Sequence, residues 1–267
     1  MTKRRGAVSG RRKRRKLNKK GQRVVWLIVF SLTTLFAVGV YRFIRCSTEE
    51  IFQSFDHPQF SKKYLVRGVD VSHHNSYINW HQLREENITF VFLKSTEGSK
   101  HKDRDYQKNY KVAKDAGLKV GSYHFYTFGR DGKKQADHFI RNSILNPGDM
   151  IPAIDVEHST INRTCSDKES YARMIKELRN LESALFKQYG KRPVIYTNKE
   201  CYKMYIEDNF TDNPLWICDL HNEPGNVYKN WVIWQFSHKG KIAGVVDDID
   251  LNYYRNSFDD FKKLLLP

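Results

Sequence analysis

Two carboxylates alternate along one short apolar segment of the chain. Residues 150–157 read MIPAIDVE, so that Asp155 and Glu157 are separated only by Val156. In a β-strand, residues i and i+2 project from the same face, with Cα atoms about 6.6 Å apart. We therefore expect both carboxylates to face one cavity, while Ile154 and Val156 pack on the opposite side.

Such a pair suggests acid–base chemistry. Two neighbouring carboxylates in a partly desolvated cleft repel each other, so the pKa of one should rise while the other stays low. The protonated group is a general acid and its ionised neighbour stabilises positive charge, which is what cleavage of a glycosidic bond requires. A cation site or a solvated strand end would present the same Asp-x-Glu pattern, so the surrounding elements must decide.

Further polar residues lie at the ends of predicted strands. Apolar, β-branched runs predict strands at 66–72, 88–94, 118–125, 150–157, 193–197, 214–220, 231–237 and 245–251. Their ends carry Asp70, Glu97, Asp155, Glu157, Asp219, Gln235 and Asp250. Aromatic residues at the same positions could offer flat faces to sugar rings or could belong to the core; they are Tyr123, Tyr126, Tyr196, Trp216 and Trp234.

Helical segments alternate with the first five strands. The clearest spans 166–190, where Ser166 and Glu169 form an expected capping box and Gly190 ends the helix. A second helix ends at Gly117, and a last one is expected near 255–265. This order predicts an α/β fold, a reduced TIM-like barrel of the type (β/α)5β3, in which the strand ends converge on one site.

Other catalytic chemistries lack support. His73 and His74 are adjacent and would point to opposite faces of a strand, and the chain has no H-x-H or H-E-x-x-H pattern. There is no G-x-S-x-G elbow, P-loop or G-x-G-x-x-G fingerprint either. We therefore expect neither a catalytic metal nor a cofactor.

The N-terminal segment predicts a membrane anchor. From Val24 to Tyr41 there are 18 consecutive uncharged residues, and about 20 apolar residues cross a bilayer core as a helix. The alternatives are a buried core helix and a cleaved signal peptide. A core helix would show a polar stripe, which this run lacks, and the run is longer than the apolar region of a signal peptide. We assign a basic cytoplasmic tail to 1–23, a transmembrane anchor to 24–44, a stalk to 45–65 and the folded body to 66–267.

Charge is concentrated before that anchor. Residues 1–23 hold 12 Lys and Arg and no acidic residue, whereas the chain from Cys46 onward has 32 basic and 30 acidic residues. The nearly neutral body gives no support to nucleic-acid binding. The basic tail predicts a cytoplasmic N-terminus and an exported body, periplasmic or extracellular. Four cysteines, at 46, 165, 201 and 218, fit an oxidising compartment, but their pairing cannot be deduced.

An ordered set of motifs resembles family 25 of the glycoside hydrolases, the N-acetylmuramidase lysozymes. It runs from about Arg67 to Tyr254 through GVDVSH (68–73), INW (78–80), KSTEG (94–98), AGLKVG (116–121), YHF (123–125), QADHF (135–139), DVE (155–157), PVIYT (193–197), PLWI (214–217), WQFS (234–237) and DLN (250–252). Two features depart from the pattern of this family. The segment Trp216-Ile217-Cys218-Asp219-Leu220 replaces the family's usual continuation at this strand. Cys165 lies in the loop after the Asp-x-Glu strand, where a disulfide could reshape the cleft.

The resemblance implies a membrane-anchored bacterial muramidase whose substrate is peptidoglycan glycan. It implies Glu157 as the general acid, with Asp155 supporting either the substrate's 2-acetamido group or a water. Asp70 and Asp250 match further acidic positions in the cleft of this family. The residues that match its cleft-lining positions are Glu97, Tyr123, Tyr196, Trp216 and Gln235. No cofactor is implied, and protein partners stay unknown. The alternative is a non-catalytic wall-binding module, which would be expected to lose one carboxylate of the pair.

Overall fold

The computed structural model describes residues 61–267, together with Lys19, Lys20, Trp26, Thr33, Thr34, Phe36, Val38 and Val40. Most of the expected basic tail, of the expected anchor and of the expected stalk lies outside the described residues. Within the described part, none of the helices combines the length and the apolar character that crossing a bilayer requires. The chain divides into two units, Met1–Phe55 and Asp56–Pro267, and the second contains the fold described below.

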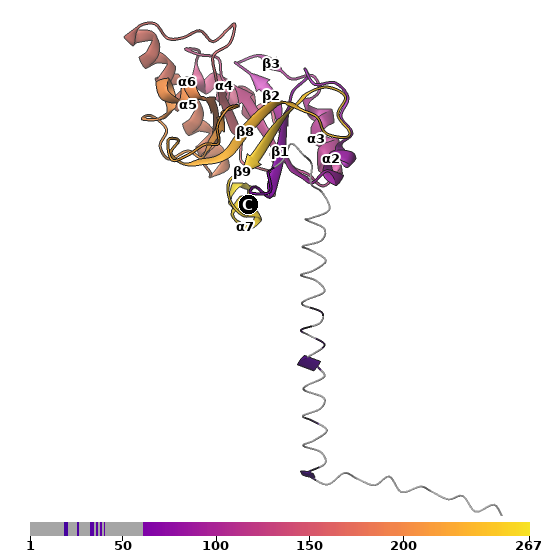
Figure 1. Ribbon diagram of the computed structural model, residues 1–267. Coiled ribbons are helices and arrows are strands. Elements are labelled where there is room, and N and C mark those ends of the chain that lie inside the picture. The colour runs from indigo at the N-terminus through magenta and orange to yellow at the C-terminus, as the bar shows by residue number, and fades with distance from the viewer. Residues whose placement is uncertain are drawn as a thin grey trace, which may run out of the picture. The chain divides into compact units, whose positions relative to one another are not determined.

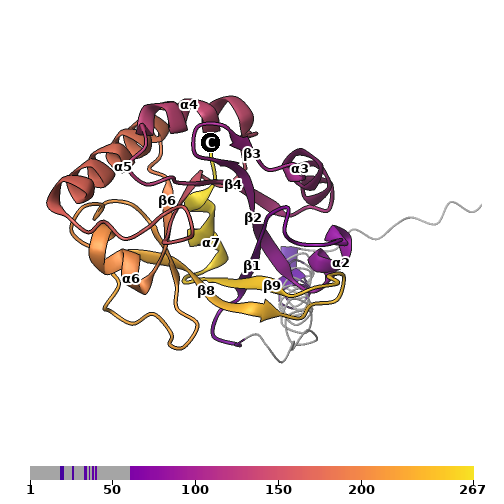
Figure 2. The ribbon, with the colours of Figure 1, turned by 90° about the horizontal axis from the view of Figure 1, so that it is seen from above.

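Eight strands close into a ring (Figures 1 and 2). They are β1 (Val66–Val71), β2 (Ile88–Glu97), β4 (Lys119–Phe125), β5 (Ala153–Val156), β6 (Val194–Asn198), β7 (Leu215–Cys218), β8 (Trp231–Gly240) and β9 (Ile249–Tyr254). Each pairs with the next in this order, and β9 pairs with β1 to complete the barrel. A short β3 (His101–Lys102) pairs only with the end of β2.

Helices follow the first five barrel strands. They are α2 (Trp80–Glu85), α3 (Tyr106–Asp115), α4 (Gly132–Asn142), α5 (Lys168–Tyr189) and α6 (Lys199–Cys201), which continues as a π-helix over Tyr202–Ile206. Figure 2 shows α3, α4 and α5 outside the ring of strands. The connections between β7, β8 and β9 contain no helix. The expected (β/α)5β3 barrel is therefore confirmed.

The expected bounds of the last barrel strand are wrong, because they begin too early in the sequence. We expected it at 245–251, but β9 spans Ile249–Tyr254 and runs antiparallel to both neighbours. Val245 makes only an isolated bridge with Ile78, and Val246 is 67% exposed, so the apolar pair belongs to a loop. Because β9 is antiparallel, its first residues lie at the rim where the parallel strands end. Asp250 therefore lies at the expected rim, but near the start of its strand and not near the end.

Two helix expectations also need correction. The capping box of α5 is formed by Asp167 and Ser170, one residue after the expected pair Ser166 and Glu169. Asp167 has an extended backbone, and one of its carboxylate oxygens accepts from the Ser170 N–H at 2.8 Å. The C-terminal helix is shorter than expected: α7 spans Phe258–Phe261 and a 3₁₀ turn follows over Lys262–Leu264. Gly190 ends α5 in the left-handed conformation, as predicted.

The barrel wall separates two apolar layers. Ile154 and Val156 point outward and pack with Leu178 and Leu181 of α5. Inside the barrel, Phe92, Trp216 and Ile233 belong to a second buried cluster. This alternation along β5 turns Asp155 inward, which confirms the expected facing of the Asp-x-Glu strand.

A close contact between α4 and α5 supplies a test of this packing. A Cβ atom added at Gly132 would lie 1.8 Å from the backbone oxygen of Glu177, so the two helices would have to separate. We expect Gly132→Ala to lower the free energy of unfolding by about 1–3 kcal/mol, the usual effect of overpacking, net of the roughly 1 kcal/mol helix preference of Ala over Gly.

Denaturant unfolding of the full-length chain measures this change. Gly225→Ala is the matched control, because a Cβ there meets nothing within 4 Å. An unchanged unfolding midpoint for Gly132→Ala would contradict the close helix contact.

Candidate active site

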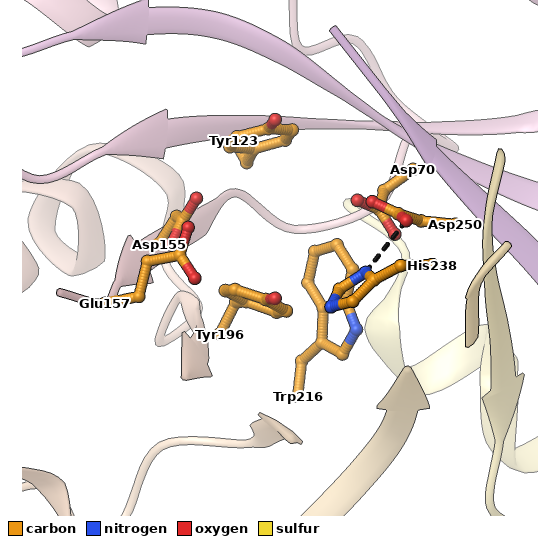
Figure 3. A pocket seen from close by; sticks show the side chains of 8 residues that line it. All are labelled: Asp70, Tyr123, Asp155, Glu157, Tyr196, Trp216, His238 and Asp250. Atoms are coloured by element: carbon orange, nitrogen blue, oxygen red, sulfur yellow. Dashed lines mark hydrogen bonds and ion pairs between the residues drawn. The ribbon is translucent and has the colours of Figure 1, made fainter. Parts of the chain in front are cut away.

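A cavity of about 270 Å³ opens at the rim of the barrel where the parallel strands end. Every barrel strand except β2 contributes a side chain to it, and Figure 3 shows these side chains converging on the cavity. The residues that line it are Asp70, Tyr123, Asp155, Glu157, Tyr196, Trp216, His238 and Asp250. Seven of these eight were expected from the sequence, and the barrel brings them together from positions up to 180 residues apart in the chain, as between Asp70 and Asp250.

Asp155 and Glu157 share one side of this cavity (Figure 3). Asp155 is 7% exposed, and its Oδ1 atom has no hydrogen-bond partner among the described residues. Burial raises the pKa of the Asp155 carboxyl well above its usual range, and the neighbouring Glu157 raises it further, while Lys94 opposes the shift. Burial also raises the pKa of Glu157, against the opposing charge of His238. Both pKa values are therefore raised, whereas we expected one of them to stay low, because both carboxyls lose hydration in the cavity.

Asp70 is held by two side-chain amides. Its Oδ2 atom accepts hydrogen bonds from Gln235 Nε2 at 2.8 Å and from Asn252 Nδ2 at 2.7 Å. The Tyr196 hydroxyl in turn donates to Gln235 Oε1 at 2.7 Å. Burial and the nearby Asp250 raise the pKa of Asp70. Gln235, which we expected in the cleft wall, is buried beneath it and orients Asp70 and Tyr196.

Aromatic rings form rigid walls of the cavity. Trp216 stacks on Phe92 with ring centroids 4.8 Å apart and meets the edge of Tyr196 at 4.7 Å. Its Nε1–H donates to Asn252 Oδ1 at 2.8 Å. Figure 3 shows Tyr123 on the opposite side of the opening from Trp216. These fixed planes suit the flat, amphipathic faces of sugar rings.

His238 was not expected from the sequence. Its Nδ1 atom lies 2.9 Å from Asp250 Oδ1, and its Nε2 atom lies 3.6 Å from Cys218 Sγ. The hydrogen bond to Asp250 and then that to Cys218 raise the pKa of His238 to about 10. The cavity therefore contains a cationic imidazolium at neutral pH, next to Asp250 and across from Glu157.

The reason that His238 escaped prediction is geometric. β8 extends to Gly240, beyond the expected strand 231–237, and its pairing with β9 shifts register between Gln235 and Ser237 and again before Gly240. Such irregularities reset which side chains point inward. A strict two-residue alternation from Trp234 therefore gives no guide to the direction of His238.

Other expected residues lie outside the cavity. Glu97 forms an ion pair with Lys94 at 2.7 Å and does not line the described cleft. Tyr126 belongs to the core, where its hydroxyl donates to the Met174 carbonyl at 3.0 Å. The Trp234 Nε1–H donates to the Asp219 carbonyl at 2.8 Å, and Asp219 itself accepts from the backbone of its own loop.

Histidines 73 and 74 also differ from expectation. They follow β1 in a turn rather than extending the strand, and their rings lie 4.0 Å apart instead of on opposite faces. His73 Nδ1 lies 2.8 Å from Asp103 Oδ2, a contact that fixes the turn. Of the cysteines in the described region, Cys165, Cys201 and Cys218 are all free thiols.

A family model places this site among known enzymes. The model described as glycosyl hydrolases family 25 matches residues 69–245, a stretch that includes Asp70, Asp155, Glu157 and His238. The chain belongs to this family. It is therefore a glycoside hydrolase, as the sequence predicted.

Individual relatives agree with this assignment. A solved structure of a family 25 glycosyl hydrolase from Bacillus anthracis is 32% identical, has a TM-score of 0.72, and is matched over 77% of this chain and 95% of that one. Lysozyme M1 from Streptomyces globisporus is 28% identical over 206 residues, 72% of this chain and 68% of that protein. The N,O-diacetylmuramidase of Chalaropsis sp. is 27% identical over 213 residues, 74% of this chain and 98% of that protein.

The electrostatics of the pair predict a pH-dependent gain in stability for Glu157→Gln. The folded-state pKa of Glu157 is raised, so the wild type loses stability as the pH rises through that value and keeps it at lower pH. The amide cannot ionise and avoids this loss. We expect Glu157→Gln to increase the free energy of unfolding by about 0.5–2 kcal/mol near pH 7, and most of this gain to disappear near pH 4.

Denaturant unfolding at the two pH values measures the effect, with Glu85→Gln on the exposed surface of α2 as the control. An equal gain at both pH values, or a loss near pH 7, would show that burial does not disfavour the charged form of Glu157.

Proposed function

We propose that this chain hydrolyses peptidoglycan, at the β-1,4 bond between N-acetylmuramic acid and N-acetylglucosamine. The observation that carries the proposal is the pair of a buried Asp155 and a half-buried Glu157 in a cavity walled by aromatic rings. Membership of a glycoside hydrolase family supplies the reaction class. Relatives named lysozyme and N,O-diacetylmuramidase favour a wall glycan as the substrate.

Glu157 acts as the general acid. It follows directly after β5 and is less buried than Asp155, so it can approach the glycosidic oxygen of a bound glycan. A general acid must hold its proton until the bond breaks, and burial raises the pKa of Glu157 in the required direction. Protonation of the leaving oxygen lets the C–O bond break without releasing an unstable alkoxide.

Asp155 acts beside the reacting carbon. The Asp155 side chain lines the cavity, and its buried Oδ1 atom has no hydrogen-bond partner among the described residues, so the carboxyl can still accept a hydrogen bond from an arriving donor. The N–H of a 2-acetamido group is one such donor, and its hydrogen bond would orient the acetamido oxygen as an internal nucleophile. An attacking water is the alternative donor. Asp70 and Asp250 place two further carboxyl groups across the cavity (Figure 3). A carboxyl group in its ionised form at such a position stabilises an oxocarbenium-like transition state.

Replacing the acid tests this proposal. We expect Glu157→Gln to reduce glycan cleavage by about 10²–10⁴-fold, the contribution of a positioned general acid, because the amide has no proton to donate. The full-length wild type and variant are incubated with purified peptidoglycan, and the products are reduced and identified by mass spectrometry. Asp155→Asn should also lose most activity, whereas Glu85→Gln should retain it.

The products separate the candidate functions. Muramic acid at the new reducing ends, present with the wild type and lost with Glu157→Gln, establishes a muramidase. Reducing ends of N-acetylglucosamine would contradict the proposed bond. If the wild type sediments with peptidoglycan but releases nothing, the alternative of a wall-binding module replaces the enzyme.

We also propose that residues 24–44 anchor the enzyme in a membrane, with residues 1–23 in the cytoplasm and the catalytic domain of 66–267 exported. The 18 uncharged residues from Val24 to Tyr41 and the 12 basic residues before them support this orientation. Anchoring would restrict hydrolysis to wall within reach of the membrane, as in local remodelling.

Two arginines in the apolar run test the anchor. We expect Leu32→Arg with Phe36→Arg to release the chain from carbonate-washed membranes, because each central Arg opposes insertion by about 2.5–3.5 kcal/mol. Leu32→Ile with Phe36→Leu is the matched control and should stay bound. Protease added outside the cell should digest the wild-type body but not the basic tail. A wild-type chain found in the medium and beginning after Gly39 would contradict anchoring.

A further inference from the structure

Cys218 stands at the edge of the active site without a role in glycan cleavage. It is the last residue of β7 and lies two residues after Trp216, so both side chains point into the barrel. Cys218 is 9% exposed and packs beside Tyr196 and Trp216, two residues that line the cavity. The thiol therefore lies just beneath the wall of the glycan cleft.

A thiol, an imidazole and a carboxylate from three neighbouring strands form a chain of side-chain contacts. Cys218 Sγ on β7 lies 3.6 Å from His238 Nε2 on β8, and His238 Nδ1 lies 2.9 Å from Asp250 Oδ1 on β9. Asp250 and Cys218 thus contact the two ring nitrogens of one histidine. This is the arrangement that activates a cysteine nucleophile, because the carboxylate orients the imidazole and the imidazolium stabilises the thiolate.

The other groups that face this array do not oppose it. Tyr196 on β6 and Tyr228 in the β7–β8 loop interact with Cys218, and burial raises the pKa of both phenols, that of Tyr228 to about 12. Both are therefore neutral near pH 7. Asp250 faces His238 and favours its protonated form, and Glu157 is a second acidic group that interacts with it. The cationic imidazolium is thus supported by its surroundings.

We propose that Cys218 is a reactive thiol and a site of reversible modification by small disulfides, and that the attached group blocks the glycan cleft. The thiolate sulfur attacks one sulfur of the disulfide, so that a new S–S bond forms on Cys218 and the original S–S bond breaks. The released half leaves as a thiolate and takes up the proton held by His238. Cys218 is oxidised and the released half is reduced, so no further oxidant is required.

Modification at this point would act on the site in two ways. The added group needs room beside Tyr196 and Trp216, so it would displace these two side chains toward the cavity of about 270 Å³ that they line and reduce the space for a sugar. It also removes the hydrogen bond between Cys218 and His238, a residue that lines the cavity. The effect on cleavage rests on the proposed function, whereas the reactivity of the thiol does not.

The chain contains its own control thiols. Cys201 is completely buried, and burial raises its pKa to about 12. Cys165 is more exposed than Cys218 and lies beside the Tyr205 hydroxyl rather than an imidazole. If access alone decided the reaction rate, Cys165 would react before Cys218. If activation by His238 decides it, Cys218 reacts first.

Site-resolved alkylation tests the reactivity. Full-length protein is treated with iodoacetamide at pH 7, and each cysteine is quantified by peptide mass spectrometry. We expect Cys218 to react faster than Cys165 and Cys201, and His238→Gln to slow Cys218 by about ten-fold, because the amide removes the imidazole that lies 3.6 Å from the sulfur. Unchanged rates at Cys165 and Cys201 show that His238→Gln is folded. A Cys218 slower than Cys165, or indifferent to His238→Gln, overturns the proposal.

Hydroxyethyl disulfide then tests blockage of the cleft. We expect peptidoglycan cleavage to fall in proportion to the modified fraction of Cys218 and to return after dithiothreitol, while Cys218→Ser cleaves normally and resists the reagent. Full cleavage by protein modified at Cys218 overturns this part of the proposal. If untreated wild type cleaves nothing, the proposed function fails instead, and the alkylation rates still decide the reactivity of Cys218.

Discussion

Burial of carboxylates at the mouth of the barrel is the constraint on which the site depends. Asp70 and Asp155 are withdrawn from water, and burial raises the pKa of each. An ionised carboxylate in such a place is stable only if donors or cations replace the lost hydration. Asp70 receives two amide donors, from Gln235 and Asn252. Asp155 lines the cavity, and one of its oxygens has no partner among residues 61–267, so its carboxyl keeps an acceptor that is not yet satisfied.

Closure of the sheet makes this arrangement possible. The amides that hold Asp70 of β1 come from β8 and β9, and these strands lie beside β1 only because the ring closes through the β1–β9 pairing. β5 approaches from the far side of the ring and brings Asp155 toward the same cavity (Figure 3). β5 places its inward side chains by simple alternation, whereas β8 departs from alternation after Gln235. Only the closed barrel converts those separate positions into one cluster of charges.

The parts of the fold that follow local rules could be predicted from the sequence. Alternation along β5 gave the facing of Asp155, and the pattern of strands and helices gave the (β/α)5β3 order. Features that depend on pairing between distant strands could not be predicted in this way. The antiparallel direction of β9 and the register shifts in β8 are set by neighbours, and they determine how Asp250 and His238 reach the cavity. Gln235 likewise fills a position beneath the site because Asp70 and Tyr196 require a partner there.

His238 connects two demands on the same cavity. Its positive charge lowers the pKa of Glu157 against the effect of burial, so it limits how firmly the acid retains its proton. The same imidazolium is hydrogen-bonded to Cys218 and to Asp250. A change in the charge or position of His238 therefore acts on both Glu157 and Cys218, and solvent screens part of the effect because the His238 side chain is 43% exposed. The register shifts in β8 direct His238 toward the cavity. His238 thus couples Cys218, which has no role in hydrolysis, to Glu157, the proposed proton donor.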